Sequence, residues 1–360
     1  MAKYVYSSSP HVKSPATTRR IMIDVCIALL PACIAGCVLL GLDNATNGWL
    51  SFMQLAICCV SAVAAEFVYL LCCKKPFMTI LKEFDFTSLV TGLLIGMNLY
   101  PTSKWYVGIL ASVFAIVVVK MLFGGTGKNI VNPAIAGRIF AFIAFGAGMG
   151  GVVIDGVMKS PITEGTIYNL DDKGLKTGAT PLNALFNGAN KNTLTNLDLF
   201  MGTGVGGSIG EICKLALIIG GIYLVVRGVL NFRWPLVYIA TTGVVAVLLA
   251  LIDGMKFVDA LGTFLPSILG GGLILGAIFM ATDYVTTPNT KLGNYIYFVC
   301  LGVLTAVLRW ATKGEAVSFA ILLMNLLVPL FDMYIRRKPF GYVKPVKEKK
   351  VKKSEQKEGE

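Results

Sequence analysis

The chain has little charge and almost no histidine. Only 14% of its 360 residues are Asp, Glu, Lys or Arg, whereas soluble domains carry about 25%. Together with 55% hydrophobic residues and a mean hydropathy of +0.72, this composition excludes a soluble domain and indicates an integral membrane protein. His11 is the only histidine, so a histidine-based metal cluster or catalytic triad is excluded as well.

The nine cysteines lack the spacing of a metal or redox site. Most of them lie within or at the ends of apolar runs, and no CxxC pair occurs. Buried thiols that act as small hydrophobic side chains are the favoured interpretation, and we expect no metal site.

The net charge of +12 is not a sign of nucleic-acid binding. Ten of the 32 basic residues lie in the tail after the last apolar run. Basic residues at the end of a membrane segment favour a position beside lipid headgroups on the cytoplasmic face. We therefore expect the tail to contact the bilayer surface and expect no nucleic-acid partner.

Ten apolar segments are candidates for membrane spans, each of which needs about 20 mostly apolar residues. The polar first twenty residues and the long run from Ile21 argue against a cleaved signal peptide. The expected spans are 21–42, 49–73, 84–100, 104–123, 133–150, 209–229, 235–252, 261–281, 293–310 and 316–334.

Charge and repetition predict how these spans are arranged. Lys and Arg concentrate in the segments that are inside if both termini are cytoplasmic, and the outer loops keep only Lys104, Lys256, Arg309 and Lys313. This bias predicts cytoplasmic termini. Five spans on each side of one long loop would insert with opposite topology, and GLLIG at 92–96 resembles GLILG at 272–276. We therefore expect an all-α protein of two inverted five-helix halves.

This arrangement divides the chain into five parts. A cytoplasmic N-terminal segment (1–20) precedes the first half (21–150), and an outer-face loop (151–208) precedes the second half (209–334). A basic cytoplasmic tail (335–360) ends the chain.

Two glycine-rich stretches look like nucleotide motifs but fail their requirements. Residues 202–207 satisfy GxGxxG without a preceding strand, and residues 123–129 lack the first P-loop glycine and have Asn129 at the magnesium position. Each stretch precedes a helix whose free N–H groups could hold an anion, and a re-entrant turn is an equal alternative. The candidate contacts are Gly127, Asn129, Asn132, Gly207 and Ser208.

Ionisable side chains at membrane depth are candidates for an ion path because their burial is costly. Glu66 lies well inside the second expected span, and Asp283 and Asp332 lie near span ends, as does Asp24. Helix capping or pairing with a nearby Arg19, Lys291 or Arg336 is the alternative for the three residues near span ends. For Glu66 the alternative is a buried hydrogen bond.

The long polar loop contains TGATPL at 177–182. Pro181 and its neighbours are typical of an ordinary turn, and from physical chemistry alone that interpretation is favoured. Covalent modification of Thr180 would need a hydroxyl, small neighbours and a flexible peptide, and Gly178 and Ala179 supply the last two.

Several long motifs, in order, resemble one known family over nearly the whole chain. They are SSPH (8–11), GKNIVNPA (127–134), GR (137–138), GSIGE (207–211), MATDYVTTP (280–288), FAILLMN (319–325) and PLFD (329–332). The sequence is similar to the RnfD family, whose members are membrane subunits of the Rnf-type ion-translocating electron transport complex. This family is related to the B-type membrane subunit of the sodium-translocating NADH:quinone reductase.

This resemblance implies a flavoprotein role. In the family, the last threonine of an S/T-G-A-T motif carries FMN through a phosphoester made by a separate flavin transferase. The resemblance thus places the flavin on Thr180, with Thr177, Gly178 and Ala179 beside it. It implies a subunit of a ferredoxin:NAD+ oxidoreductase in the bacterial cytoplasmic membrane, which relays electrons while the complex moves sodium ions or protons.

The resemblance also indicates partners and leaves some points open. The expected partners are the other membrane and peripheral subunits of the complex, above all the other subunit with covalent FMN. No side chain of this chain is expected to act as a catalyst. Whether a second, non-covalent flavin such as riboflavin binds, with the anion contacts above as its candidates, stays open.

Three other functions remain as alternatives. The first is a flavoprotein like the B-type membrane subunit of the quinone reductase. The second is a passive small-solute channel with the same inverted repeat, and the third is a scaffold for assembly. A bound flavin would exclude a simple channel.

Overall fold

The described part of the chain is helical except for one small hairpin. The computed structural model describes residues 17–43, 45–145, 152–154, 157–159, 196–202, 207–312 and 314–335. Strands β1 (Val152–Ile154) and β2 (Val157–Lys159) pair antiparallel, with Val153 opposite Met158. This hairpin corrects the all-α expectation at one place, within the long loop. Its strands are three residues long, too short to give a recognisable sequence pattern.

The first half of the chain forms a group of helices that matches the expected segments. Short α3 was not expected; the remaining helices lie within or slightly beyond the first five expected spans. The elements are α1 (Thr18–Asp43), α2 (Ala45–Cys72), α3 (Phe77–Glu83), α4 (Thr87–Asn98), α5 (Trp105–Val113), the π-helix η1 (Phe114–Met121) and α6 (Pro133–Ala144).

The second half contains helices at all five expected places, but one of these segments is broken. The expected span at 261–281 contains three helical pieces separated by glycines. The elements are α8 (Asn196–Met201), η3 (Ile209–Glu211), α9 (Lys214–Val226), α10 (Arg233–Ile252), α11 (Phe257–Gly262), α12 (Phe264–Leu269), α13 (Leu273–Leu275), the π-helix η4 (Gly276–Met280), α14 (Lys291–Thr312) and α15 (Val317–Tyr334).

The protein is a multi-pass membrane protein. Among the described residues, α1, α2, α10, α14 and α15 are long and apolar enough to cross a bilayer. Residues 257–269 and 273–280 form a pair bent by 60° that counts as a sixth span if taken together. The other apolar helices are shorter, and α4, with 12 residues, is only about 18 Å long. The expectation of similar full-length spans is therefore wrong for these helices.

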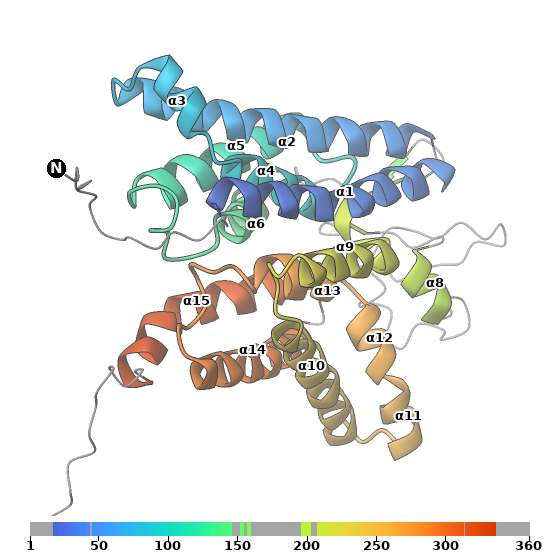
Figure 1. The fold of residues 1–360 in the computed structure, drawn as a ribbon. Helices are drawn as coiled ribbons and strands as arrows, with labels where there is room; N and C mark the ends of the chain where they lie inside the picture. The colour runs from blue at the N-terminus through green and yellow to red at the C-terminus, as the bar shows by residue number, and fades with distance from the viewer. Residues whose placement is uncertain are drawn as a thin grey trace, which may run out of the picture.

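The two halves form separate groups that meet along one boundary (Figure 1). In the first group α2 packs against α4 and α5, and in the second α10 packs against α14 and α12. Across the boundary α1 lies beside α9, and α6 contacts α15.

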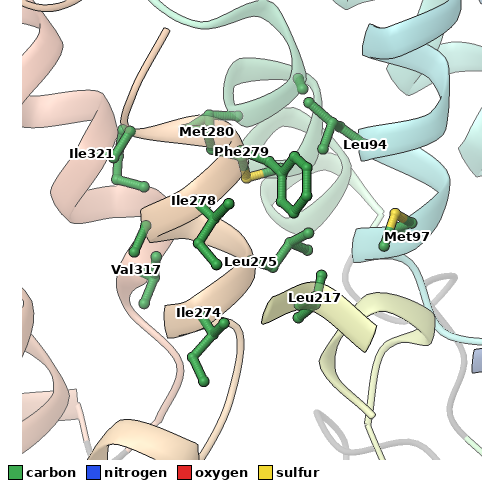
Figure 2. Packing of buried hydrophobic residues seen from close by; sticks show 14 of the residues in the cluster. Leu94, Met97, Leu217, Ile274, Leu275, Ile278, Phe279, Met280, Val317 and Ile321 are labelled. Atoms are coloured by element: carbon green, nitrogen blue, oxygen red, sulfur yellow. The ribbon is translucent and has the colours of Figure 1, made fainter. Parts of the chain in front are cut away.

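Apolar side chains fill the boundary near its centre. Leu94 and Met97 of α4 lie opposite Leu275 and Phe279, with Leu217 of α9 beside them (Figure 2). Lipid tails are as apolar as these side chains, so close van der Waals packing, rather than escape from water, holds such surfaces together in a membrane.

Glycines allow the closest helix contacts, as the sequence indicates. A Cβ atom on Gly92 would lie 2.7 Å from the carbonyl oxygen of Cys58 in α2, and one on Gly276 would lie 2.6 Å from Cγ1 of Val317 in α15. Neither distance is tolerated in a packed structure, so the expected role of these two glycines in close packing is confirmed.

We predict that Gly92→Ala destabilises the protein by about 1–3 kcal/mol, because the added methyl group pushes α4 away from α2. A lower melting temperature of the purified protein in detergent would show this. Gly262→Ala is the matched control, since no atom lies within 4 Å of a Cβ at that position. Equal melting temperatures for the two variants would contradict the prediction.

Candidate functional site

The expected site residues fall in different parts of the molecule. Thr180 and its neighbours Thr177, Gly178 and Ala179 lie outside the described residues. The remaining expected residues are described, and they separate into a cavity, a buried ion pair and a charged cluster at the boundary between the halves.

The first cavity lies at the end of the molecule where α1 begins. It has a volume of about 130 Å³ and brings together residues from α1, α4, η1, α9 and η4. Four of the expected residues are in its wall: Gly127, Asn129, Asn132 and Asp283. The sequence therefore identified one face of this cavity without showing that the parts meet.

The glycine-rich segment before α6 forms an irregular turn in this wall. Gly124, Gly125 and Gly127 have φ values of +107°, +91° and +86°, a region that favours glycine. The Asn129 side chain donates to the carbonyl of Val131 at 3.0 Å and so steadies the turn. Of the two interpretations for this stretch, the irregular turn describes its backbone.

Asn132 joins the turn to both halves of the protein. Its Oδ1 accepts from the backbone N–H of Ala134 at 3.0 Å, and its Nδ2 donates to the carbonyl of Met280 in η4 at 3.0 Å. With Pro133 at the first helical position, this is a favourable start for α6. One N–H group that was expected to be free for an anion is therefore already satisfied.

Glu66 is held in a buried ion pair. Its Oε1 lies 2.8 Å from Nζ of Lys120, and the two side chains are 8% and 3% exposed. Lys120 also donates to Thr87 Oγ1 at 2.5 Å, and both residues line the first cavity. The carboxylate therefore contacts the cavity wall through the lysine.

The network continues to Asp85 beyond the start of α4. Both Thr87 and Thr126 donate to its carboxylate, at 2.6 and 2.8 Å. Burial alone would raise the pKa of Asp85, but these hydrogen bonds and the nearby Lys120 ammonium outweigh burial and lower it. Asp85 therefore stays anionic at neutral pH and balances the charge of the pair.

We predict that Lys120→Met alone destabilises the protein by about 3–5 kcal/mol, because it leaves Glu66 charged and unpaired in a buried place. The double variant Lys120→Met/Glu66→Gln should recover most of this loss. Thermal unfolding of the three purified variants (the two single changes and the double change) measures the difference. A double variant less stable than either single variant would contradict it.

Sequence reasoning placed two basic residues wrongly. Lys120 was counted with charges of a cytoplasmic segment and Arg309 with those of the outer loops, but both side chains are buried. Arg309 lies in the last turn of α14, and its Nη2 is 3.1 Å from Glu315 Oε2. The available signal was the absence of any other charge in the apolar runs around each residue, which indicates a functional or paired group.

Arg138 is the centre of a charged cluster at the boundary between the halves. Its Nη1 donates to Asn98 Oδ1 at 2.8 Å and to Ser318 Oγ at 3.0 Å. Its Nη2 lies 3.3 Å from Glu211 Oε1, and both partners of this pair are largely buried. Lys214 donates to the carbonyl of Glu211.

Gly207 and Ser208 belong to this cluster rather than to the first cavity. They directly precede η3, which contains Glu211, and a Cβ on Gly207 would lie 3.4 Å from the Glu211 carboxylate. The two groups of expected anion contacts therefore cannot share one ligand.

The glycine break between α12 and α13 is tied to a second buried ion pair. Glu315 accepts from the backbone N–H of Gly272 at 3.1 Å. Arg309 donates to the carbonyls of Ser267 at 2.8 Å and Gly270 at 3.2 Å. The pair thus satisfies backbone groups that the bend leaves without helical partners, which a broken helix at membrane depth requires.

The aspartates near helix ends have other partners than expected. Asp24 pairs with Arg227 at 3.1 Å, in α1 and directly after α9 respectively, and not with Arg19, whose guanidinium lies 5.4 Å from the ring centre of Phe86. Their separation of 203 residues hides this pairing from sequence reasoning.

Asp332 and Asp283 lie near the two cavities. Both carboxylate oxygens of Asp332 accept from Asn289, at 2.9 and 2.8 Å, while its expected partner Arg336 is outside the described residues. Asp283 makes no ion pair with Lys291 in the described part of the chain and is in the wall of the first cavity.

Comparison with known proteins identifies the group to which this arrangement belongs. The sequence matches the profile of the NQR2, RnfD, RnfE family over residues 5–341. The chain belongs to this family. The resemblance inferred from the motifs is thereby confirmed.

Full-length relatives of the family are closely similar to this chain. It is 37% identical to the RnfD subunit of the Na(+)-translocating ferredoxin:NAD(+) oxidoreductase complex of Acetobacterium woodii, over 96% of this chain and 98% of the relative. It is 34% identical to the RnfD subunit of the ion-translocating oxidoreductase complex of Stutzerimonas stutzeri, over 89% and 92%. It is 32% identical to the RnfD subunit of the proton-translocating ferredoxin:NAD(+) oxidoreductase complex of Clostridium ljungdahlii, over 94% and 96%.

Proposed function

We propose that this chain is the RnfD subunit of an Rnf-type ferredoxin:NAD+ oxidoreductase complex and that it relays electrons while the complex moves Na+ or H+ across the membrane. The full-length similarity to the corresponding subunits of such complexes carries the proposal. One of these relatives is named for sodium and the other for protons, so the similarity supports ion coupling but not the choice of ion.

The proposed cofactor is FMN, joined to Thr180 through a phosphoester. The TGAT sequence at 177–180 supports this assignment, because Gly178 and Ala179 leave the hydroxyl accessible to a flavin transferase. Bound FMN would supply the redox chemistry, and the chain would supply its position and its surroundings. The chain therefore has no reaction of its own and works only with the other subunits.

We predict that Thr180→Ala abolishes covalent flavin, because the only proposed acceptor oxygen is removed. In-gel flavin fluorescence after denaturing electrophoresis and the intact mass of the purified chain both measure this. Thr177→Ala is the control and should keep the flavin. A fluorescent band in the Thr180→Ala variant would overturn the assignment.

The same mass measurement separates the alternative functions. A passive channel or a scaffold would carry no flavin on any threonine. A flavoprotein of the quinone-reductase type would carry it, but its complex would reduce a quinone rather than NAD+. Measuring both acceptors with the purified complex distinguishes these two.

A ten-span arrangement in two inverted halves is the proposed topology. In such a repeat, equivalent elements meet across the axis between the halves, and contacts of α1 with α9, α4 with α13–η4 and α6 with α15 follow this rule. Arg138 and Ser318, which hydrogen bond to each other, are 180 residues apart, and so are the matched glycines Gly92 and Gly272.

The proposed orientation puts both termini in the cytoplasm and the long loop with Thr180 on the outer face of the bacterial cytoplasmic membrane. The concentration of Lys and Arg in the inner segments and the tail supports it. The first cavity, which α1 lines with its first turns, would then open toward the cytoplasm.

A second, non-covalent flavin needs a separate test. The first cavity offers amide and hydroxyl groups from Thr87, Asn129 and Asn132 on apolar walls, which suits a flavin ring edge. Its volume of about 130 Å³ is below the roughly 300 Å³ of ordinary ligand pockets. Binding would therefore require its walls to move, and the count of flavins released by acid decides whether a second flavin is present.

Three carboxylates are the proposed members of an ion path. Glu66 contacts the first cavity through Lys120, Asp283 is in its wall, and Asp332 holds Asn289 beside it. All three therefore lie toward one end of the molecule, which would be the cytoplasmic end of the path.

We predict that Glu66→Gln, Asp283→Asn and Asp332→Asn each reduce ion transport more than covalent flavin content, because they remove a charge without touching the flavin loop. Transport by the reconstituted complex, divided by its fluorescence in a denaturing gel, is the measurement. Normal transport in all three variants would place the ion path in other subunits.

A further inference from the structure

A second, larger cavity adjoins the first and has no role in the proposed function. Its volume is about 530 Å³, and Val229, Leu230, Thr282 and Tyr284 are common to both walls. It lies between the turn after α9, the start of α10, the turn after η4 and the first turns of α14. Tyr284 donates to the carbonyl of Val229 at the shared wall.

The wall of this second cavity is polar but carries no Asp, Glu, Lys, Arg or His side chain among the described residues. Its polar groups are amides and hydroxyls, among them Asn231, Asn294 and Thr287. Asn294 Oδ1 is buried and has no hydrogen-bond partner in the part of the chain that the structure describes. A buried acceptor without a donor is costly, so the cavity suits an uncharged group that carries hydroxyl donors.

Aromatic rings form one side of the cavity and join α10 to α14. Trp234 is stacked on Phe298 with ring centres 6.0 Å apart and planes 8° apart, and it meets Tyr295 at 4.9 Å edge to face. Trp and Tyr concentrate where a membrane protein meets the headgroup layer. The ring set therefore indicates that the cavity lies at headgroup depth.

Two cationic side chains flank the cavity without being part of its wall. Arg233 directly precedes Trp234, and Lys291 lies between the wall residues Asn289 and Asn294. Both are exposed, and neither makes an ion pair with any described residue. They are available for an anionic group at the mouth of the cavity.

A ligand with an ammonium group would find no matching anion here. Both carboxylate oxygens of the neighbouring Asp332 accept hydrogen bonds from Asn289. The surroundings therefore favour a phosphate outside the cavity and a neutral hydroxylated end inside it.

Apolar side chains continue from the cavity along the outer faces of the same two helices. Leu236 of α10 and Leu292 and Ile296 of α14 are 61%, 61% and 38% exposed, and α10 and α14 pack side by side. Such a surface suits acyl chains in a bilayer, as side chains of this kind face lipid in membrane helices.

We propose that the second cavity binds the headgroup of an anionic phospholipid whose terminal group is uncharged and hydroxylated, of the phosphatidylglycerol type. The glycerol end lies among Asn231, Asn294 and Thr287, the phosphate meets Arg233 and Lys291, and the acyl chains follow α10 and α14. This site is independent of the flavin on Thr180.

The test uses the purified complex in detergent after removal of its lipids. It is incubated with an equimolar mixture of phosphatidylglycerol, phosphatidylethanolamine and phosphatidylcholine, and the retained lipids are counted by native mass spectrometry. We expect retention of phosphatidylglycerol above the other two. The double variant Arg233→Gln/Lys291→Gln should lower it about tenfold or more, since each basic residue contributes to the attraction of an anionic lipid.

Two further variants separate the site from general surface charge. Asn294→Leu removes the buried acceptor and should lower the preference for phosphatidylglycerol over phosphatidylethanolamine while leaving the charges in place. Lys82→Gln, an exposed lysine of α3, is the control and should retain phosphatidylglycerol like the unchanged protein. Covalent flavin should be the same in all variants, so a wrong flavin assignment would not affect this result.

Several results would overturn the proposal. Equal retention of the three lipids would do so, as would unchanged retention of phosphatidylglycerol in the double variant or equal loss in Lys82→Gln. Competition by glycerophosphoglycerol, which has the headgroup but no acyl chains, at the same concentration as the lipid would indicate a site for a soluble phosphodiester instead. Displacement of the lipid by riboflavin would assign the cavity to a flavin.

Discussion

The need to pair buried charges between the two halves controls the rest of this structure. Arg138 reaches Asn98, Ser318 and Glu211, which come from three separate parts of the chain. A guanidinium left without partners at this depth would be very costly. The ends of α4 and η3 and the start of α15 must therefore lie where they do, and the apolar packing between Leu94, Met97 and Phe279 fits around them.

The short and broken helices follow from the same requirement. A helix that stops inside the membrane leaves carbonyl and N–H groups that lipid cannot satisfy. Around the bend after α12, Arg309 and Glu315 bind the free backbone groups, and at the start of α6 the Asn132 side chain does so. The buried polar residues are thus part of the architecture, and they gather at the places where a ligand or an ion would meet the interior.

Much of the fold could be predicted from the sequence, because hydrophobic runs of sufficient length have few alternatives to a helix. The bend at Gly270–Gly272 and the short length of α4 could not, since composition does not reveal where a helix stops within an apolar run. At the candidate site the motif residues Gly127, Asn129 and Asn132 were found. Lys120 and Arg309 were missed as buried partners, because their acids are distant in sequence or in another helix and pairing depends on tertiary contacts.

Asn132 gives the first cavity a mechanical property. One amide group holds the first turn of α6 through its oxygen and the end of η4 through its nitrogen, and it is also part of the cavity wall. A molecule that turned this side chain on entering would release both helices in one movement. Occupancy of a small space near one surface would thereby be reported to the seam between the halves, without any long chain of intermediate contacts.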